Sequence, residues 1–181
     1  RGLGDVYKRQ TTGNGFPAHC YTIFKLMWMK AHQSEVFSNM KHVLGSKDYI
    51  NYRMTGKILT DHSYASGTGG YNLKEARYQQ EFWDAAGIDM DLLPKIVPSD
   101  TVVGYLTEQA ARELGLTTKT AVMAGGVDNA CMALGATGIR DGAAYISLGS
   151  SSWVPVTACR PVLDFKTRPY VFAHIEPGMY T

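Results

Sequence analysis

The chain has 181 residues, of which 45% are hydrophobic and 19% charged, which is the composition of a globular protein and excludes a disordered one. A formal net charge of only +2 gives no electrostatic argument for nucleic-acid binding. No run of residues approaches the roughly 20 apolar positions that span a membrane. Three cysteines without Cys-x-x-Cys spacing indicate reduced thiols, so we expect a cytoplasmic protein without nucleic-acid or membrane partners.

Helices are predicted in the first half of the chain by apolar periodicity and by glycines at the helix ends. They are expected at residues 24–31, 34–44 (from Ser34 as N-cap to Gly45 as stop), 48–54 (ended by Gly56) and 79–86 (ended by Gly87). The polar, glycine-rich stretch between the last two, residues 60–70, predicts a loop or an irregular pair of strands.

The second half of the chain alternates a helix with short strands. The helix is predicted from an N-cap at Thr107 to a stop at Gly115, and a short buried strand is predicted over residues 120–124. Two further strands, at residues 143–148 and 153–158, are expected to form a hairpin around the sequence GSSS. Alternation of this kind is typical of an α/β fold.

The stretch VMAGGVDNACMALGA, residues 122–136, places an acidic residue between a predicted strand and a predicted helix. Gly125 and Gly126 leave room there for the close approach of a ligand or of a neighbouring backbone. Asp128 would then stand at the carboxyl end of the strand, where ligands gather in open α/β sheets. The alternative is that Asp128 only caps the helix, and the local pattern by itself favours that interpretation.

Two other stretches could carry chemistry. The turn in YISLGSSSWVPV could offer backbone N–H groups and hydroxyls to phosphate oxygens, although an ordinary hairpin needs no ligand and is preferred on these residues alone. In TDHSYASGTGG, the side chains of Asp61, Ser63, Ser66 and Thr68 could contact a substrate. Such residues more often satisfy the backbone of a turn, and we keep that interpretation here.

Seven short motifs, taken together and in their order, resemble the FGGY family of carbohydrate kinases, and its xylulokinase-like branch most. They are GN near the start, FKLMWMK, KDYINYRMTGKILTDHSYASGT, GID-x-x-LLPKI, VVGYLT, AGGVDN and YISLGSSS. The resemblance implies an incomplete actin-like (ribonuclease-H-type) ATPase fold of two domains, with sugar and ATP in the cleft between them. Residues 11–140 would belong to the N-terminal, sugar-binding domain, and residues 141–181 would begin the C-terminal, ATP-binding domain.

The resemblance also implies roles for individual residues. Asp128 matches the catalytic base of the family, which reverses the preference for a helix cap. Gly126 and Asn129 flank this residue and are expected to shape the sugar pocket. No residue matches a metal ligand, and Mg²⁺ is expected as the companion of ATP. The turn that contacts the ATP phosphates is matched by Gly149, Ser150 and Ser151.

We therefore expect part of an ATP-dependent sugar kinase that phosphorylates a hydroxyl of a ketose or polyol, with D-xylulose preferred and a homodimer left open. The alternative is a non-catalytic, sugar-binding relative with a regulatory or assembly role. Asp128 favours the kinase, because a binding module needs no base at that position. The family's amino-terminal phosphate loop and carboxyl-terminal adenosine region have no counterpart, so we expect the chain alone to be inactive.

The opening decapeptide RGLGDVYKRQ has no apolar period and resembles the translation of a transposase-type sequencing-library adapter. We therefore exclude residues 1–10 from the predicted fold as a non-native segment. We expect this segment to pack against nothing.

Overall fold

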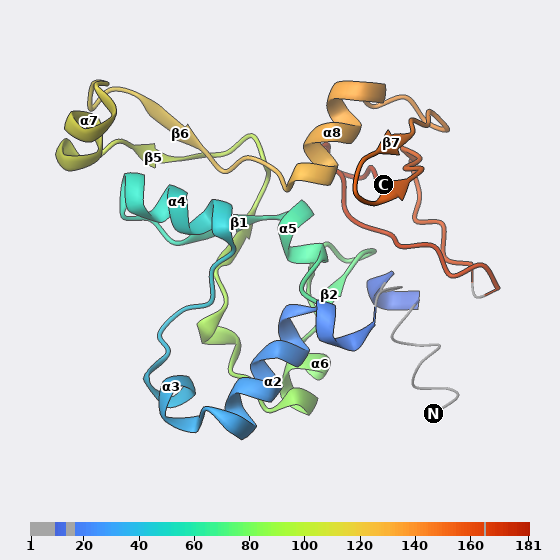
Figure 1. Ribbon diagram of the computed structural model, residues 1–181, viewed down its shortest axis with the longest axis horizontal. Helices are drawn as coiled ribbons and strands as arrows, with labels where there is room; N and C mark the ends of the chain where they lie inside the picture. The colour runs from blue at the N-terminus through green and yellow to red at the C-terminus, as the bar shows by residue number, and fades with distance from the viewer. Residues whose placement is uncertain (1–9, 14–16, 165) are drawn as a thin grey trace.

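The structure is a computed structural model that describes residues 10–13, 17–164 and 166–181. Its helices (Figure 1) are η1 (Ala18–Cys20), α2 (Thr22–His32), α3 (Ser34–Asn39), α4 (Ser46–Thr55), α5 (His62–Ser66), α6 (Gln80–Ala86), η2 (Met90–Leu92), α7 (Glu108–Leu114) and α8 (Asp128–Thr137). Its strands are β1 (Leu59–Asp61), β2 (Tyr71–Asn72), β3 (Arg77–Tyr78), β4 (Lys95–Val97), β5 (Val102–Tyr105), β6 (Ala121–Met123), β7 (Ser147–Leu148) and β8 (Ser152–Trp153). This mixture of helices and strands agrees with the predicted α/β class.

The strands form two-stranded pairs, of which β1 and β4 are parallel. The pairs β2–β3, β5–β6 and β7–β8 are antiparallel. In the parallel pair Asp61 lies opposite Val97, so both strands end at the same edge. The chain leaves that edge through α5 on one side and through Ser99 on the other, which brings their polar groups together.

The larger hydrophobic core surrounds Trp83 and Tyr71, whose side chains are fully buried between α2, α6 and the β2–β3 pair. The Trp83 indole N–H donates to the carbonyl of Gly70 at 2.8 Å. Val171 and Ala173, from the segment predicted to begin the second domain, belong to the same core. The predicted domain boundary near residue 140 stays a prediction.

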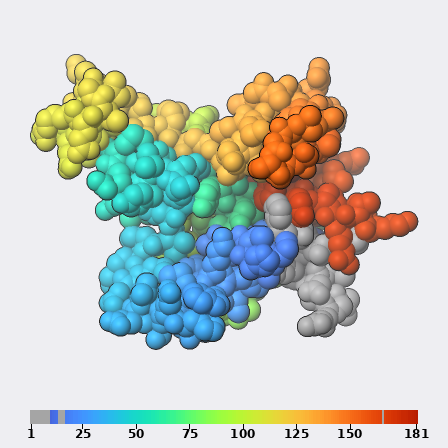
Figure 2. Space-filling model, viewed as in Figure 1, coloured from blue at the N-terminus to red at the C-terminus, as the bar shows by residue number. Residues whose placement is uncertain are grey.

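A smaller core forms where α7 packs on the β5–β6 pair and on α4. Its buried residues are Leu106, Ala110, Ala111 and Val122, and Met54 of α4 packs against them. Figure 1 shows this unit apart from α8 and the β7–β8 hairpin, and in Figure 2 the α7 and α8 segments project from the upper edge on either side of a notch.

Most of the predicted helix ends are confirmed. Gly56, Gly87 and Gly115 end α4, α6 and α7 with the positive φ angles, 66° to 72°, that favour glycine. Thr107 caps α7 by accepting the N–H of Ala110 at 3.2 Å. The predicted hairpin is also confirmed, although each of its strands is only two residues long.

The predicted helix over residues 34–44 is wrong in its second half, because α3 ends at Asn39 and Met40 is extended. The N–H of Val43 instead donates to the carbonyl of Leu92 at 2.8 Å. Met40 and Val43 pack against the larger core although neither lies in a helix, so their packing does not require one. Gly45 is the N-cap of α4 and not a helix stop.

Two further expectations need correction. Residues 60–70 form the end of β1, the helix α5 and a turn, because the Asp61 side chain caps α5 by accepting the N–H groups of Ser63 and Tyr64. The predicted buried strand is β6, in which only Val122 is buried while its neighbours are exposed. Val122 points to the face of the pair that is covered by the smaller core, and Ala121 and Met123 point to the opposite, uncovered face.

Candidate active site

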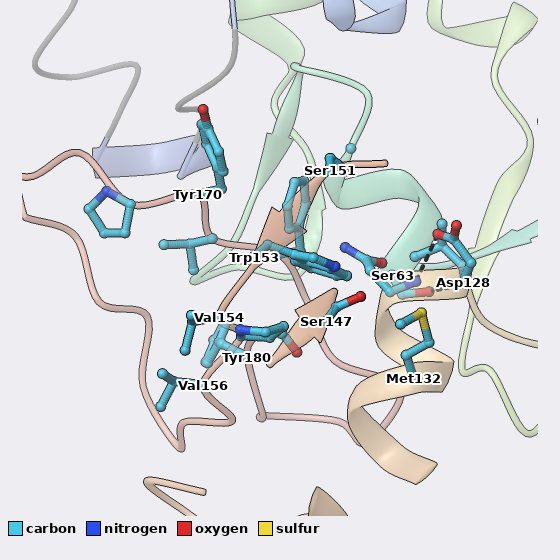
Figure 3. Close-up of a pocket in the computed structure, with 18 of the residues that line it drawn as sticks. Ser63, Asp128, Met132, Ser147, Ser151, Trp153, Val154, Val156, Tyr170 and Tyr180 are labelled. Atoms are coloured by element: carbon cyan, nitrogen blue, oxygen red, sulfur yellow. Dashed lines mark hydrogen bonds between the residues drawn. The ribbon is translucent and has the colours of Figure 1, made fainter. Parts of the chain in front are cut away.

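A cavity of about 1290 Å³ opens between the start of α8, the helix α5, the η1–α2 segment and the β7–β8 hairpin (Figure 3). Its described lining residues are Cys20, Thr22 and Lys25; Ser63, Tyr64 and Gly67; Val127, Asp128, Asn129 and Met132; residues 147 and 149–156; and residues 158, 162, 169–172, 180 and 181. Asp128 is the one acidic side chain, and Lys25 the one basic side chain, among these described residues.

Asp128 is the first residue of α8, and its side chain is exposed to the cavity. The N-cap is Val127, which has no side-chain group to cap the helix, so the interpretation of Asp128 as the N-cap is wrong. One carboxylate oxygen of Asp128 accepts the N–H of Asn129 at 2.7 Å. A negative charge in the first turn of a helix is favoured by the helix dipole. The carboxylate is therefore accessible at the cavity wall.

Asn129 and Gly126, the two predicted sugar contacts, occupy different surroundings. Asn129 lines the cavity, and its buried Oδ1 has no hydrogen-bond partner among the described residues. An amide oxygen can accept hydrogen bonds, so this one has unused acceptor capacity beside the cavity. Gly126 is not among the lining residues, and a Cβ there would lie 2.7 Å from Cγ1 of Ile175. Because Ile175 packs so closely against Gly126, a larger residue would not fit at this position unless Ile175 shifted.

The predicted phosphate turn lies in the wall that belongs to the β7–β8 hairpin. Gly149, Ser150 and Ser151 are exposed and line the same cavity as Asp128. The N–H of Gly149 donates to the carbonyl of Ser151 at 3.2 Å and closes the turn. Figure 3 shows the neighbouring Trp153 pointing from the hairpin toward the side of the cavity that carries Asp128.

Most of the hydroxyls and the carboxylate of TDHSYASGTGG form hydrogen bonds with nearby backbone groups, as the turn interpretation predicts. The Oγ1 of Thr68 donates to the carbonyl of Ala65 at 2.7 Å, and the Oγ of Ser66 donates to the carbonyl of Ser63 at 2.8 Å. Ser63 differs because it also lines the cavity. The N–H of Val127, the residue before Asp128, donates to the Oγ of Ser63 at 2.9 Å. No pattern in the sequence pointed to this long-range contact.

A buried ion network lies behind the cavity wall. The ammonium group of Lys47 lies 2.6 Å from the carboxylate of Asp48 and 2.9 Å from that of Asp61. Both carboxylates are buried, and Asp48 also accepts the hydroxyl of Thr60 at 2.6 Å. Burial alone would raise the pKa of Asp61, but hydrogen bonds from Lys47 and Ser63 and the charge of Lys47 hold it below its usual 3.8. The two carboxylates in turn raise the pKa of Lys47, against the effect of its burial.

The described residues contain no group of three His, Cys, Asp or Glu side chains that could hold a metal ion. Across the same residues, no helix is long and apolar enough to cross a membrane. Cys20, Cys131 and Cys159 are free and exposed.

The family model for the N-terminal domain of FGGY carbohydrate kinases matches residues 5–135, more than half of the chain. The chain belongs to the FGGY family of carbohydrate kinases. The match begins inside the opening decapeptide. Of this segment only Gln10 is described, so the prediction that residues 1–10 derive from an adapter and pack against nothing lies outside the described residues.

Two relatives of this FGGY chain are xylulose kinases. The enzyme of Bacillus subtilis is 36% identical over 154 residues, which is 85% of this chain and 31% of that protein. The enzyme of Lactococcus lactis is 34% identical over 159 residues, which is 87% of this chain and 31% of that protein. The chain thus spans about a third of the length of the curated relatives it matches.

Solved structures of family members superpose closely on this FGGY chain. A gluconate kinase from Lactobacillus acidophilus matches with a TM-score of 0.89 and 28% identity, covering 96% of this chain and 35% of that one. A ligand-bound xylulose kinase from the same organism matches with a TM-score of 0.88 and 28% identity, with the same coverage. The fold is therefore the actin-like ATPase fold of these sugar kinases, present here in part. Because the gluconate kinase and the xylulose kinase match almost equally well, the fold alone does not favour either substrate.

Proposed function

We propose that the full-length protein is an ATP-dependent sugar kinase that phosphorylates D-xylulose, with Asp128 as its general base. The observation that carries the proposal is that Asp128 and the turn of Gly149, Ser150 and Ser151 line one cavity. A kinase needs both elements, because a base must face the sugar hydroxyl while N–H and hydroxyl donors face the phosphates of ATP.

The proposed reaction is an in-line transfer of the γ-phosphoryl group of MgATP. The sugar hydroxyl oxygen attacks the γ-phosphorus as the bond from that phosphorus to the departing ADP oxygen breaks. The hydroxyl proton passes to the Asp128 carboxylate, which later releases it to water. Asn129 accepts a hydrogen bond from the sugar through its free Oδ1, and Gly126 keeps the loop before Asp128 closely packed.

D-xylulose is the proposed substrate because xylulose kinases are the relatives with 34% and 36% identity. A second candidate is an aldonate such as gluconate, because Lys25 gives the cavity one cation that could pair with a carboxylate. We place the reaction in the cytoplasm, where ATP is available and where exposed free cysteines stay reduced.

The test is an ADP-release assay of the purified full-length protein with D-xylulose, gluconate and glycerol. We expect the highest kcat/KM with D-xylulose. A preference for gluconate would replace the proposed substrate and keep the kinase. Sugar binding without ADP release for any substrate would instead support the non-catalytic relative and overturn the proposed activity.

A further inference from the structure

Asp61 is a buried carboxylate at the end of β1 that lies directly behind the cavity wall. Its partners converge from three segments. Lys47 lies 2.9 Å away, Ser99 donates its hydroxyl at 2.8 Å, and Ser63 donates both its N–H, at 3.0 Å, and its hydroxyl. A carboxylate that is removed from water needs such a set of donors, and their number fixes its position.

Asp61 also fixes the direction in which the Ser63 hydroxyl can act. A serine hydroxyl has one hydrogen to donate, and here it goes to Asp61, which as a carboxylate can only accept. The Ser63 oxygen is therefore left as an acceptor, and it receives the N–H of Val127 at 2.9 Å. Ser63 is 1% exposed, so water does not readily replace this contact.

The other end of the loop before α8 is held by the same network. The Ala124 carbonyl accepts the Asn51 side-chain amide at 3.0 Å and the Lys47 ammonium group at 3.3 Å. The N–H of Gly125 donates to the carbonyl of Ser99 at 2.9 Å. Residues 124–127 are thus tied at both ends to groups that contact Asp61.

We infer that Asp61 and Ser63 are positioning residues for Asp128, and the inference rests on the proposed role of Asp128 as the base. Asp61 orients the hydroxyl of Ser63, and Ser63 holds the backbone N–H one residue before the base. Figure 3 shows Ser63 beside Asp128 at the cavity wall. A displacement of about 1 Å in a reacting group can cost roughly 100-fold in rate, so the loss of this contact should reduce turnover.

The test compares Ser63→Ala with Ser66→Ala in the full-length kinase. Ser66 is the matched control because it also lies buried in α5 and accepts a distant backbone N–H, that of Ala173 at 3.1 Å. Both variants should lose similar thermal stability. Only Ser63→Ala should lower kcat, by about 10- to 100-fold, with little change in the KM for sugar. Ser63→Thr, which keeps the hydroxyl, should recover most of the turnover.

A double variant separates positioning from general destabilisation. If Ser63 acts through Asp128, Ser63→Ala with Asp128→Asn should be no slower than Asp128→Asn alone. Equal kcat for Ser63→Ala and Ser66→Ala, with Asp128→Asn impaired, would overturn the positioning inference and leave the proposed function intact. Normal turnover of Asp128→Asn would overturn the proposed base instead.

Should Ser63→Ala fail to fold, Val127→Pro removes the same hydrogen bond from the donor side. The φ of −68° at Val127 already suits proline, and the ring places carbon where the N–H points toward Ser63. We expect the same loss of kcat in this variant. Turnover equal to that of the unmodified kinase would count against the inference.

Discussion

The N–H of Val127 donates to the Oγ of Ser63 at 2.9 Å, although 64 positions separate the two residues in the chain. This hydrogen bond joins α5 to the loop that delivers Asp128 to the cavity. The buried Asp61 in turn orients the Ser63 hydroxyl and is paired with Lys47. The position of the proposed base therefore depends on an ion pair whose two side chains do not line the cavity.

Asp128→Asn should abolish most of the turnover of the full-length kinase without unfolding it. Asparagine keeps the shape and can still accept the N–H of Asn129, but it cannot take up a proton at neutral pH. The kcat for phosphorylation should fall by about 10²- to 10⁴-fold, and sugar binding should be largely kept. Steady-state kinetics, sugar titration and thermal melting check the three expectations, and an unchanged kcat would remove Asp128 from the mechanism.

Gly45→Ala should destabilise the protein, because a Cβ at this position would collide with the ring of Tyr64. The contacting atoms are those at the far end of the Tyr64 ring, so the ring must shift within the cavity that it lines to make room. We expect a loss of about 1–3 kcal/mol in the free energy of unfolding, the usual cost of overpacking.

Gly135→Ala is the matched control for this substitution. Gly135 lies inside α8 and has nothing within 4 Å of its Cβ position, so alanine should stabilise the helix slightly. Urea unfolding of both variants checks the contrast, and equal unfolding midpoints would show that the ring of Tyr64 yields.

Lys47→Met should be strongly destabilising, because it leaves the buried carboxylates of Asp48 and Asp61 without their cation. Loss of one partner from a buried ion network costs about 3–5 kcal/mol. Lys57→Met, at an exposed position, is the control and should stay within about 0.5 kcal/mol of the unmodified protein. Urea unfolding measures both, and similar values for the two variants would argue against the network as a structural element.

Stability should decline as the pH falls below about 6.5, in part because of His174. Burial lowers the pKa of His174 below its usual 6.5, although the charge of Glu176 opposes the shift. The unfolded chain then binds a proton that the folded site resists, so this stability is fully present above about pH 6.5 and is lost below it. Burial also lowers the pKa of His62, which adds a contribution of the same sign.

His174→Asn isolates this contribution. Its Oδ1 can replace Nδ1 of the imidazole, which accepts the N–H of Glu176 at 3.1 Å, but asparagine does not titrate. Unfolding free energies at pH 7.5 and 5.5 should differ less in His174→Asn than in the unmodified protein. His19→Asn, which removes an exposed imidazole, serves as the control and should keep the original difference.

The elements that depend on local interactions were predictable from sequence. The helices α4, α6 and α7 end at glycines in the left-handed region, and Thr107 caps α7 with its own hydroxyl. These signals lie within a few residues of the structure they specify. The resemblance of the motif order likewise led to the family, and Asp128 and the turn at 149–151 lie on one cavity as that resemblance implies.

Tertiary contacts decided the rest. Met40, Val43 and Leu44 have a spacing that suits a helix, but the hydrogen bond from Val43 to Leu92 and the packing of Met40 and Val43 on the larger core hold this segment outside any helix. Gly126, predicted to touch sugar, packs against Ile175, which lies far away in the sequence. Local sequence signals were enough to predict where α4, α6 and α7 end and which family the chain resembles. Only the folded chain decided what positions Asp128, because the hydrogen bond from Val127 to Ser63 forms only once α5 lies beside the loop before α8.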